Sequence, residues 1–255
     1  MKISVVIPVF NEEDSVKELY GQISTALKNQ KKYEIIFIND GSSDKSEKAI
    51  IDLSNEDKRV KLISFYRNFG KSAALSEGFK YAFGEIIITM DADLQDDPNE
   101  ISNLINKLDE GYDLVSGWKQ KRYDPWTKTF PSKIFNFVTR RLTGVNIHDF
   151  NCGLKAYRSS VIKSIEVFGG RHRYIPALAG QMNFSVSEIV VNHRPRIYGE
   201  TKYGGSRIFH GFFDLITILF LDRYDQQPLH LFGSFGLLFF TFGLISFLVI
   251  SFFFL

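Results

Sequence analysis

The chain has 255 residues, of which 44% are hydrophobic, and a formal net charge of +2 at pH 7. This length is sufficient for one α/β domain with its own core and a further segment. The nearly balanced charge excludes a protein that binds nucleic acid through a strong basic field, so we expect no nucleic-acid partner. The single cysteine, Cys152, excludes an internal disulfide and agrees with a reducing compartment. A small buried apolar side chain is its more ordinary role.

Two apolar runs near the N-terminus end in polar turns. Residues 3–10 lead into Asn11 and Glu12, and residues 33–38 lead into residues 39–44. Each run is short, rich in β-branched residues and followed by a polar stretch of helical character. This alternation predicts βαβα units and a parallel sheet. The first run is too short for a signal peptide and is broken by Pro8, so we expect the domain that follows to stay in the cytosol.

A third apolar run, residues 86–90, ends in Asp91 and Asp93. Residues i and i+2 of an extended chain lie on the same side, so we expect both carboxylates to face one hard cation. Open α/β sheets bind ligands at this end of their strands. An isolated D-x-D is more often an ordinary polar loop, but two other strand ends here also carry carboxylates. The sequence therefore predicts a ligand site at this rim.

The middle of the chain continues the pattern. Residues 68–84 predict a loop followed by a helix, whose sheet-facing side would consist of Ala74, Leu75, Gly78, Phe79 and Ala82. Residues 98–110 predict another helix, with Pro98 in its first turn and Gly111 after its end. Residues 112–117 predict a further strand.

Four motifs together resemble the inverting family-2 glycosyltransferases, which carry a GT-A nucleotide-sugar domain. They are residues 6–12 (Val-Ile-Pro-Val-Phe-Asn-Glu), 39–44 (Asn-Asp-Gly-Ser-Ser-Asp), 68–75 (Asn-Phe-Gly-Lys-Ser-Ala-Ala-Leu) and 91–95 (Asp-Ala-Asp-Leu-Gln). The chain is most similar to the polyprenyl-phosphate branch, which includes dolichol-phosphate mannose synthase and bactoprenol glucosyltransferases. Residues 149–158, and Arg196 followed by Lys202, fit that branch. The resemblance covers essentially the whole chain and implies an α/β, Rossmann-like GT-A fold with a mostly parallel sheet.

The resemblance also implies roles for individual residues. The nucleotide would be bound by Pro8, Phe10, Glu12, Asp40, Lys71, Asp91 and Ala92. A divalent cofactor, Mg²⁺ or Mn²⁺, would be held by Asp91, Asp93 and Gln95, and the catalytic residues would be Asp93, Arg196 and Lys202. The acceptor phosphate would be contacted by Arg122, Lys128 and Ser132. Lys128 replaces the usual Arg, so only a point charge remains at that position.

The two cationic segments also have simpler interpretations. Residues 118–136 have the composition of an ordinary solvated basic loop. The loop with Arg196 and Lys202 could lie near anionic lipid headgroups without taking part in chemistry. The chemical argument for the second loop is that a departing nucleoside diphosphate accumulates negative charge, which two cations and a divalent metal would stabilise.

The C-terminus differs in composition from the rest of the chain. Residues 231–255 contain no charged residue, and at ~1.5 Å per residue a helix of this length crosses the ~30 Å hydrocarbon core of a bilayer. Residues 208–221 are too short to cross and have polar neighbours, so they predict an interfacial helix, with packing on the domain as the alternative. We expect a glycosyltransferase domain at 1–206, an interfacial segment at 207–228 and a transmembrane helix at 229–255. Relatives usually continue into a second membrane helix, so a truncated chain is one alternative.

The expected function follows from the resemblance. The enzyme would transfer a sugar, with UDP-glucose favoured as donor, to undecaprenyl phosphate with inversion, on the cytosolic face of the inner membrane. A GDP-mannose-dependent enzyme, another family-2 polysaccharide glycosyltransferase and an inactive membrane adaptor remain alternatives, and a homo-oligomer is left open. A processive synthase would need Q-x-x-R-W, but neither Trp118 nor Trp126 follows an Arg. A dehydrogenase would need G-x-G-x-x-G after the first strand, where this chain has Pro-Val-Phe-Asn-Glu.

Overall fold

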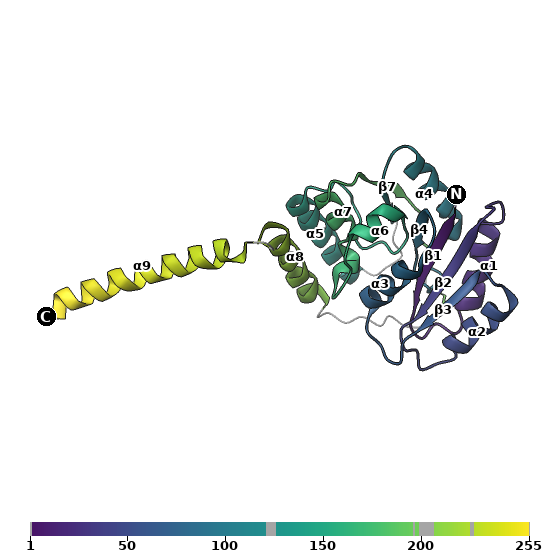
Figure 1. Ribbon diagram of the computed structural model, residues 1–255, viewed down its shortest axis with the longest axis horizontal. Helices are drawn as coiled ribbons and strands as arrows, with labels where there is room; N and C mark the ends of the chain where they lie inside the picture. Colours follow the sequence, from purple (N-terminus) through teal and green to yellow (C-terminus); the bar gives the residue numbers. More distant parts are fainter. Residues whose placement is uncertain (1, 121–125, 196, 199–206, 225–226, 255) are drawn as a thin grey trace. The chain divides into compact units, whose positions relative to one another are not determined.

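The computed structural model describes residues 2–120, 126–195, 197–198, 207–224 and 227–254 (Figure 1). The chain forms two compact units, Met1–Asp214 and Leu215–Leu255. The predicted boundaries at 206/207 and 228/229 remain predictions, since the division into units falls inside a helix.

The first unit is built on a seven-stranded sheet in the order β3-β2-β1-β4-β6-β5-β7. The strands are β1 (Ile3–Val9), β2 (Tyr33–Asn39), β3 (Val60–Ser64), β4 (Ile86–Thr89), β5 (Leu114–Trp118), β6 (Lys155–Arg158) and β7 (Val186–Val190). Among these described strands only β6 is antiparallel to its neighbours, β4 and β5. The prediction of a mostly parallel α/β sheet is confirmed.

Helices cover both faces of this sheet (Figure 1). They are α1 (Val16–Ala26), α2 (Ser46–Glu56), α3 (Lys71–Tyr81), α4 (Ile101–Asp109), α5 (Trp126–Thr143), α6 (Ser159–Ser164) and α7 (Ile175–Gln181), with 3₁₀ turns η1 (Pro98–Glu100) and η2 (Arg171–Arg173). Alternate residues of β1 enter two cores: Val5 packs with α1, α2 and α4, and Val6 packs with α3. Because both faces are buried, the strands are continuously apolar, as parallel strands usually are.

The strand order places a topological switch point beside β1. The chain runs from β1 outward to β2 and β3, then returns to β4 on the opposite side of β1. Ligands of open α/β sheets bind beyond the carboxyl ends of the strands at such a point. The loops after β1 and β4, which carry Phe10 and Asp91, therefore lie at the position where this fold class binds ligands.

The predicted elements around this point are confirmed with small shifts of their ends. Residues 98–110 form η1 followed by α4 rather than one continuous helix. Strands β3, β6 and β7 were not predicted. Their sequences are short or contain charged residues, as in Lys155–Arg158, so their periodicity is weak.

The second unit includes most of α8 (Arg207–Tyr224) and all of α9 (Pro228–Phe254). Residues Pro228–Phe253 have a mean hydropathy of 2.3 and none of this helix is buried, so by length and composition it could span a membrane. The apolar segment before it is helical, as expected. The interfacial placement of that helix stays a prediction.

The packing of α3 on the sheet gives a first prediction. A Cβ on Gly78 would lie 2.5 Å from Val6 Cγ1 and 2.7 Å from Ile38 Cδ1, whereas one on Gly21 in α1 would meet nothing within 4 Å. We expect Gly78→Ala to cost about 1–3 kcal/mol by overpacking. Gly21→Ala should instead stabilise its helix by about 1 kcal/mol. Thermal unfolding of the full chain in detergent, followed by circular dichroism, compares them; equal stability of the two variants would contradict this account of the α3–sheet contact.

Candidate functional site

The loops after β1 and β2 are joined by hydrogen bonds. Asn11 N donates to Ser42 Oγ at 3.0 Å, and Glu12 N donates to Ser46 Oγ at 2.8 Å. The amide of Asp40, next to these loops, donates to Val9 O at 2.8 Å. Serines that follow one strand thus satisfy the free amides that follow another. The structure brings the predicted nucleotide residues Glu12 and Asp40 to one rim.

Asp40 is buried and binds the loop that leads into α3. Its two carboxylate oxygens accept hydrogen bonds from Phe69 N at 2.7 Å and Gly70 N at 2.9 Å. Burial raises the pKa of Asp40, and the two amides only partly oppose this. Its neighbour Gly41 has φ +68°, and a Cβ there would lie 2.3 Å from Arg67 C, so the two loops approach closely only because this residue is glycine. Asp40 therefore fixes the start of α3, where Lys71 lies.

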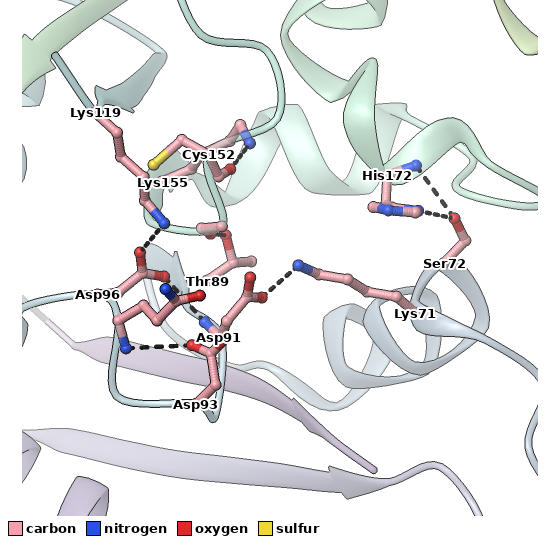
Figure 2. Close-up of polar contacts among 12 residues, drawn as sticks. Lys71, Ser72, Thr89, Asp91, Asp93, Asp96, Lys119, Cys152, Lys155 and His172 are labelled. Carbon is pink, nitrogen blue, oxygen red and sulfur yellow. Dashed lines mark hydrogen bonds and ion pairs between the residues drawn. The ribbon is translucent and has the colours of Figure 1, made fainter. Parts of the chain in front are cut away.

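Lys71 forms an ion pair with Asp91, the first residue of the D-x-D (Figure 2). Burial acts to raise the pKa of Asp91, but Lys71, Lys119 and Lys155 outweigh it and hold that pKa well below its usual range. A Cβ on Gly153 would lie 2.6 Å from Asp91 Oδ2, so the carboxylate occupies its position only because residue 153 is glycine. The two predicted nucleotide residues Lys71 and Asp91 are thus in contact.

The chain beyond Asp91 is not extended, which corrects the same-side argument made from the sequence. Residues 92–94 form a turn in which Leu94, fully buried, has φ +61°. Such a conformation is uncommon for a residue other than glycine and is found where the surroundings hold it in place. Asp93 Oδ1 accepts a hydrogen bond from Gln95 N at 3.2 Å within this turn. Whether both carboxylates meet at one cation remains a prediction.

Two lysines that we did not predict lie around Asp91 (Figure 2). Lys119, directly after β5, lies 2.7 Å from the buried Asp96, and Asp96 Oδ2 accepts the Asp91 N–H at 3.1 Å. Lys155 is buried in β6, where its Nζ donates to Cys152 O. Burial lowers the pKa of Lys155 and raises that of the Cys152 thiol to about 12. Lys119 could have been identified from the sequence because it directly follows a strand, at the rim where ligands bind.

A further polar wall comes from η2. His172 Nδ1 lies 2.8 Å from Ser72 Oγ, and His172 N donates to the same oxygen at 3.2 Å. The pocket beside α3 is lined, among others, by Lys71, Asp91, Gly153, Lys155, Tyr157 and His172. Ammonium, imidazole and hydroxyl groups side by side suit a ligand rich in anionic or hydroxyl oxygens.

A divalent metal at this rim would need oxygen ligands from the carboxylates. Over the described part of the chain, no group of three or more His, Cys, Asp or Glu side chains gathers into a metal cage. Mg²⁺ does not require one, because it commonly uses one or two carboxylates together with substrate phosphates. Asp91 and Asp93, two residues apart in the sequence, both carry hard oxygen donors of the kind that such a partial site uses.

The remaining predicted residues are only partly within the described chain. Pro8 lies in β1, and Ala92 is buried in the turn. Ser132 lies in helix α5. Lys128 belongs to the same helix, but its side chain is outside the description, and Arg122, Arg196 and Lys202 lie outside the described residues. Their roles stay predictions.

The fold and this rim define an α/β protein with a polar ligand site at the switch point of a mostly parallel sheet. Residues 4–166 match Glycosyl transferase family 2. The chain is 39% identical to dodecaprenyl-phosphate galacturonate synthase of Rhizobium johnstonii over 93% of its own length and 72% of that protein. It is also 39% identical to undecaprenyl-phosphate 4-deoxy-4-formamido-L-arabinose transferase of Edwardsiella ictaluri, over 91% and 71%. The chain therefore belongs to glycosyltransferase family 2.

One solved structure shares the fold of this chain at a low sequence identity. Glucosyl-3-phosphoglycerate synthase from Mycobacterium tuberculosis, in complex with Mn²⁺, UDP-glucose and phosphoglyceric acid, superposes with a TM-score of 0.64 at 20% identity. The match covers 87% of this chain and 79% of that one. It confirms the expected fold class, a GT-A-like domain.

Proposed function

We propose that this glycosyltransferase moves a sugar from a nucleotide diphosphate to a polyprenyl phosphate, with inversion at the transferred carbon. The observation that carries the proposal is the cation-lined Asp91 rim in the same chain as an apolar helix, α9, that could span a membrane. Two relatives at 39% identity are named for products on dodecaprenyl and undecaprenyl phosphate, which supports the same acceptor class here.

The donor would lie across the carboxyl ends of β1, β2 and β4. Pro8, Phe10, Glu12 and Asp40 would hold the nucleoside, and Lys71, beside Asp91, would face the diphosphate. Asp91, Asp93 and Gln95 would hold Mg²⁺ or Mn²⁺ there, which supplies charge neutralisation for the diphosphate when bound. The fold neighbour named above was solved with Mn²⁺ and UDP-glucose, which supports a divalent ion and a UDP-sugar.

The remaining cations would act on the leaving group and the acceptor. Arg196 and Lys202 would stabilise the charge that develops on the departing nucleoside diphosphate. Arg122, Lys128 and Ser132 would contact the acceptor phosphate, with Arg122 able to form a bidentate pair. The protein would then act mainly by holding two anionic groups close together and in line.

The identity of the sugar is tested with a donor panel. Radiolabelled UDP-glucose, a UDP-uronate and GDP-mannose are each supplied with undecaprenyl phosphate, and lipid-extractable label is counted. We expect label from a UDP-sugar. UDP-glucose is the leading candidate because of the Asn39-Asp40 pair in the nucleotide motif. Label from GDP-mannose alone would establish the alternative enzyme class. Release of the nucleotide from a donor that leaves no lipid-linked label would contradict the acceptor.

The cellular location of the enzyme is inferred from the cytosolic pool of sugar nucleotides and from the apolar helix α9. We propose that residues 1 to 228 lie in the cytosol and that α9 anchors them to the inner membrane, as an apolar helix of this length can. A reporter enzyme fused after Ser206 should therefore be active only on the cytosolic side. Activity of a periplasmic reporter at this position would contradict the topology.

The metal assignment predicts a specific loss of turnover. Because Asp93 would be a ligand of the divalent ion, Asp93→Asn should lower turnover at least ~100-fold, the scale seen when a key electrostatic contact to the transition state is removed. A chelator should abolish activity, and Mg²⁺ or Mn²⁺ should restore it. Initial rates with and without chelator test this directly, with Asp57→Asn, distant in the α2–β3 loop, as the matched control. Full turnover in chelator would rule out the metal.

The acceptor chemistry predicts that no general base is required. A phosphate monoester with a second pKa of about 6 is largely dianionic at neutral pH, whereas a sugar hydroxyl must lose its proton during attack. Replacing Asp149, Glu12, Asp96 and Asp97 singly by their amides should therefore leave the shape of the pH–turnover profile unchanged. Turnover is measured at saturating substrates, alongside UDP and Mn²⁺ binding. A loss of several orders of magnitude with normal binding would identify a base.

A further inference from the structure

The segment that leaves β7 runs along the turn that carries the D-x-D. Asp96 and His193 form an isolated antiparallel bridge, and Arg194 N donates to Gln95 O at 3.0 Å. The buried Asp96 in turn binds the amide of Asp91. Backbone hydrogen bonds therefore join the carboxylate turn to the segment that reaches Arg196 two residues later in the sequence.

Side chains strengthen this junction at Arg194. Its Nη2 lies 2.7 Å from Asp97 Oδ1, and its Nη1 donates to Gln22 Oε1 at 2.7 Å. The other oxygen of Asp97 accepts from Asn192 Nδ2 at 3.3 Å. Arg194 thus connects helix α1, the turn after β4 and its own segment. The planar guanidinium can do this because its donors point in fixed directions, which a single ammonium cannot reproduce.

We propose that Arg194 is a positioning residue that, through Asp97 and Gln22, fixes residues 193–195, the described residues that precede Arg196 in the sequence, relative to Asp91 and Asp93. This inference rests on the proposed function, in which Arg196 acts on the departing diphosphate. Both terminal nitrogens of Arg194 are used by protein side chains, so its effect on the reaction is indirect. Stabilisation by a cation depends steeply on its placement, and an error of about 1 Å costs up to about 100-fold in rate.

Loss of stability would not explain such an effect. The Arg194 side chain is 28% exposed, and ion pairs that remain in contact with water contribute little to global stability. The Arg59–Asp57 pair, at 2.8 Å in the loop before β3, offers a matched control with an Arg side chain that is 49% exposed. Removing either guanidinium should affect unfolding similarly, whereas only Arg194 should affect the reaction.

The experiment compares Arg194→Met with Arg59→Met in the full chain, in detergent, with undecaprenyl phosphate and the donor selected by the panel. For Arg194→Met we expect kcat to fall about 10- to 100-fold, as when a group that orients a reacting residue is lost. The donor KM, and UDP affinity with Mn²⁺ by calorimetry, should change less than about twofold, because ground-state binding is retained. Arg194→Lys and Asp97→Asn should show the same pattern, and Asp97→Asn carries the test should Arg194→Met not fold.

A double-mutant cycle decides whether Arg194 acts through Arg196. Arg196→Met alone should cost about 100-fold or more in kcat, and adding Arg194→Met should then cost less than about twofold more. Losses that multiply, or wild-type kcat for Arg194→Met, would overturn the inference and leave the proposed function intact. Full activity of Arg196→Met would instead remove the proposed role of Arg196, and the inference with it.

Discussion

The site depends on one constraint: buried or partly buried carboxylates at the ends of strands must be compensated, by cations at Asp91 and Asp96 and by backbone amides at Asp40. Asp91 pairs with Lys71, and the buried Asp96, which accepts the amide hydrogen of Asp91, pairs with Lys119. Removing one partner of such a pair leaves an uncompensated buried charge, which costs more than the pair itself contributes. Lys155 is also buried nearby. The cations that compensate these carboxylates therefore lie at the rim where an anionic donor would bind, so the contacts that permit folding also place positive charges beside the proposed ligand site.

The parallel sheet explains why distant segments form this rim. Asp40, Asp91 and Lys119 follow β2, β4 and β5, whose carboxyl ends all point the same way. Helix α3 contributes Lys71 because Asp40 holds the backbone at Phe69 and Gly70. Each contact joins the end of one βα unit to the beginning of another. The rim is therefore part of the framework of the sheet, and its described side chains are held by contacts within that framework.

The sequence predicted the parts of the fold that have strong patterns. β1, β2, β4 and α3 were predicted because continuous apolar runs and helical spacing identify them. The turn at residues 92–94 was not predicted, since its left-handed Leu94 is fixed by tertiary contacts and not by local preference. Lys119 and Lys155 were missed for a similar reason: a lysine is ordinary on any surface, and only the packing of β5 and β6 around Asp91 makes these two significant. The family motifs indicated Asp91 and Lys71 but not that they pair.

The proposed acceptor gives α9 a role in the chemistry. A polyprenyl phosphate keeps its chain in the bilayer and its phosphate at the surface, so an enzyme diffusing freely in three dimensions would meet it rarely. A helix long and apolar enough to span the membrane would confine the enzyme to the same surface. This would raise the effective concentration of the polyprenyl phosphate around the enzyme. Confinement does not remove the repulsion between a phosphate and a nucleoside diphosphate, which grows as the two approach in a site that excludes water. The anchor would therefore bring the enzyme and its lipid acceptor together. The lysines around Asp91, with the metal and the predicted arginines, would then offset the repulsion between the two anions so that they can react.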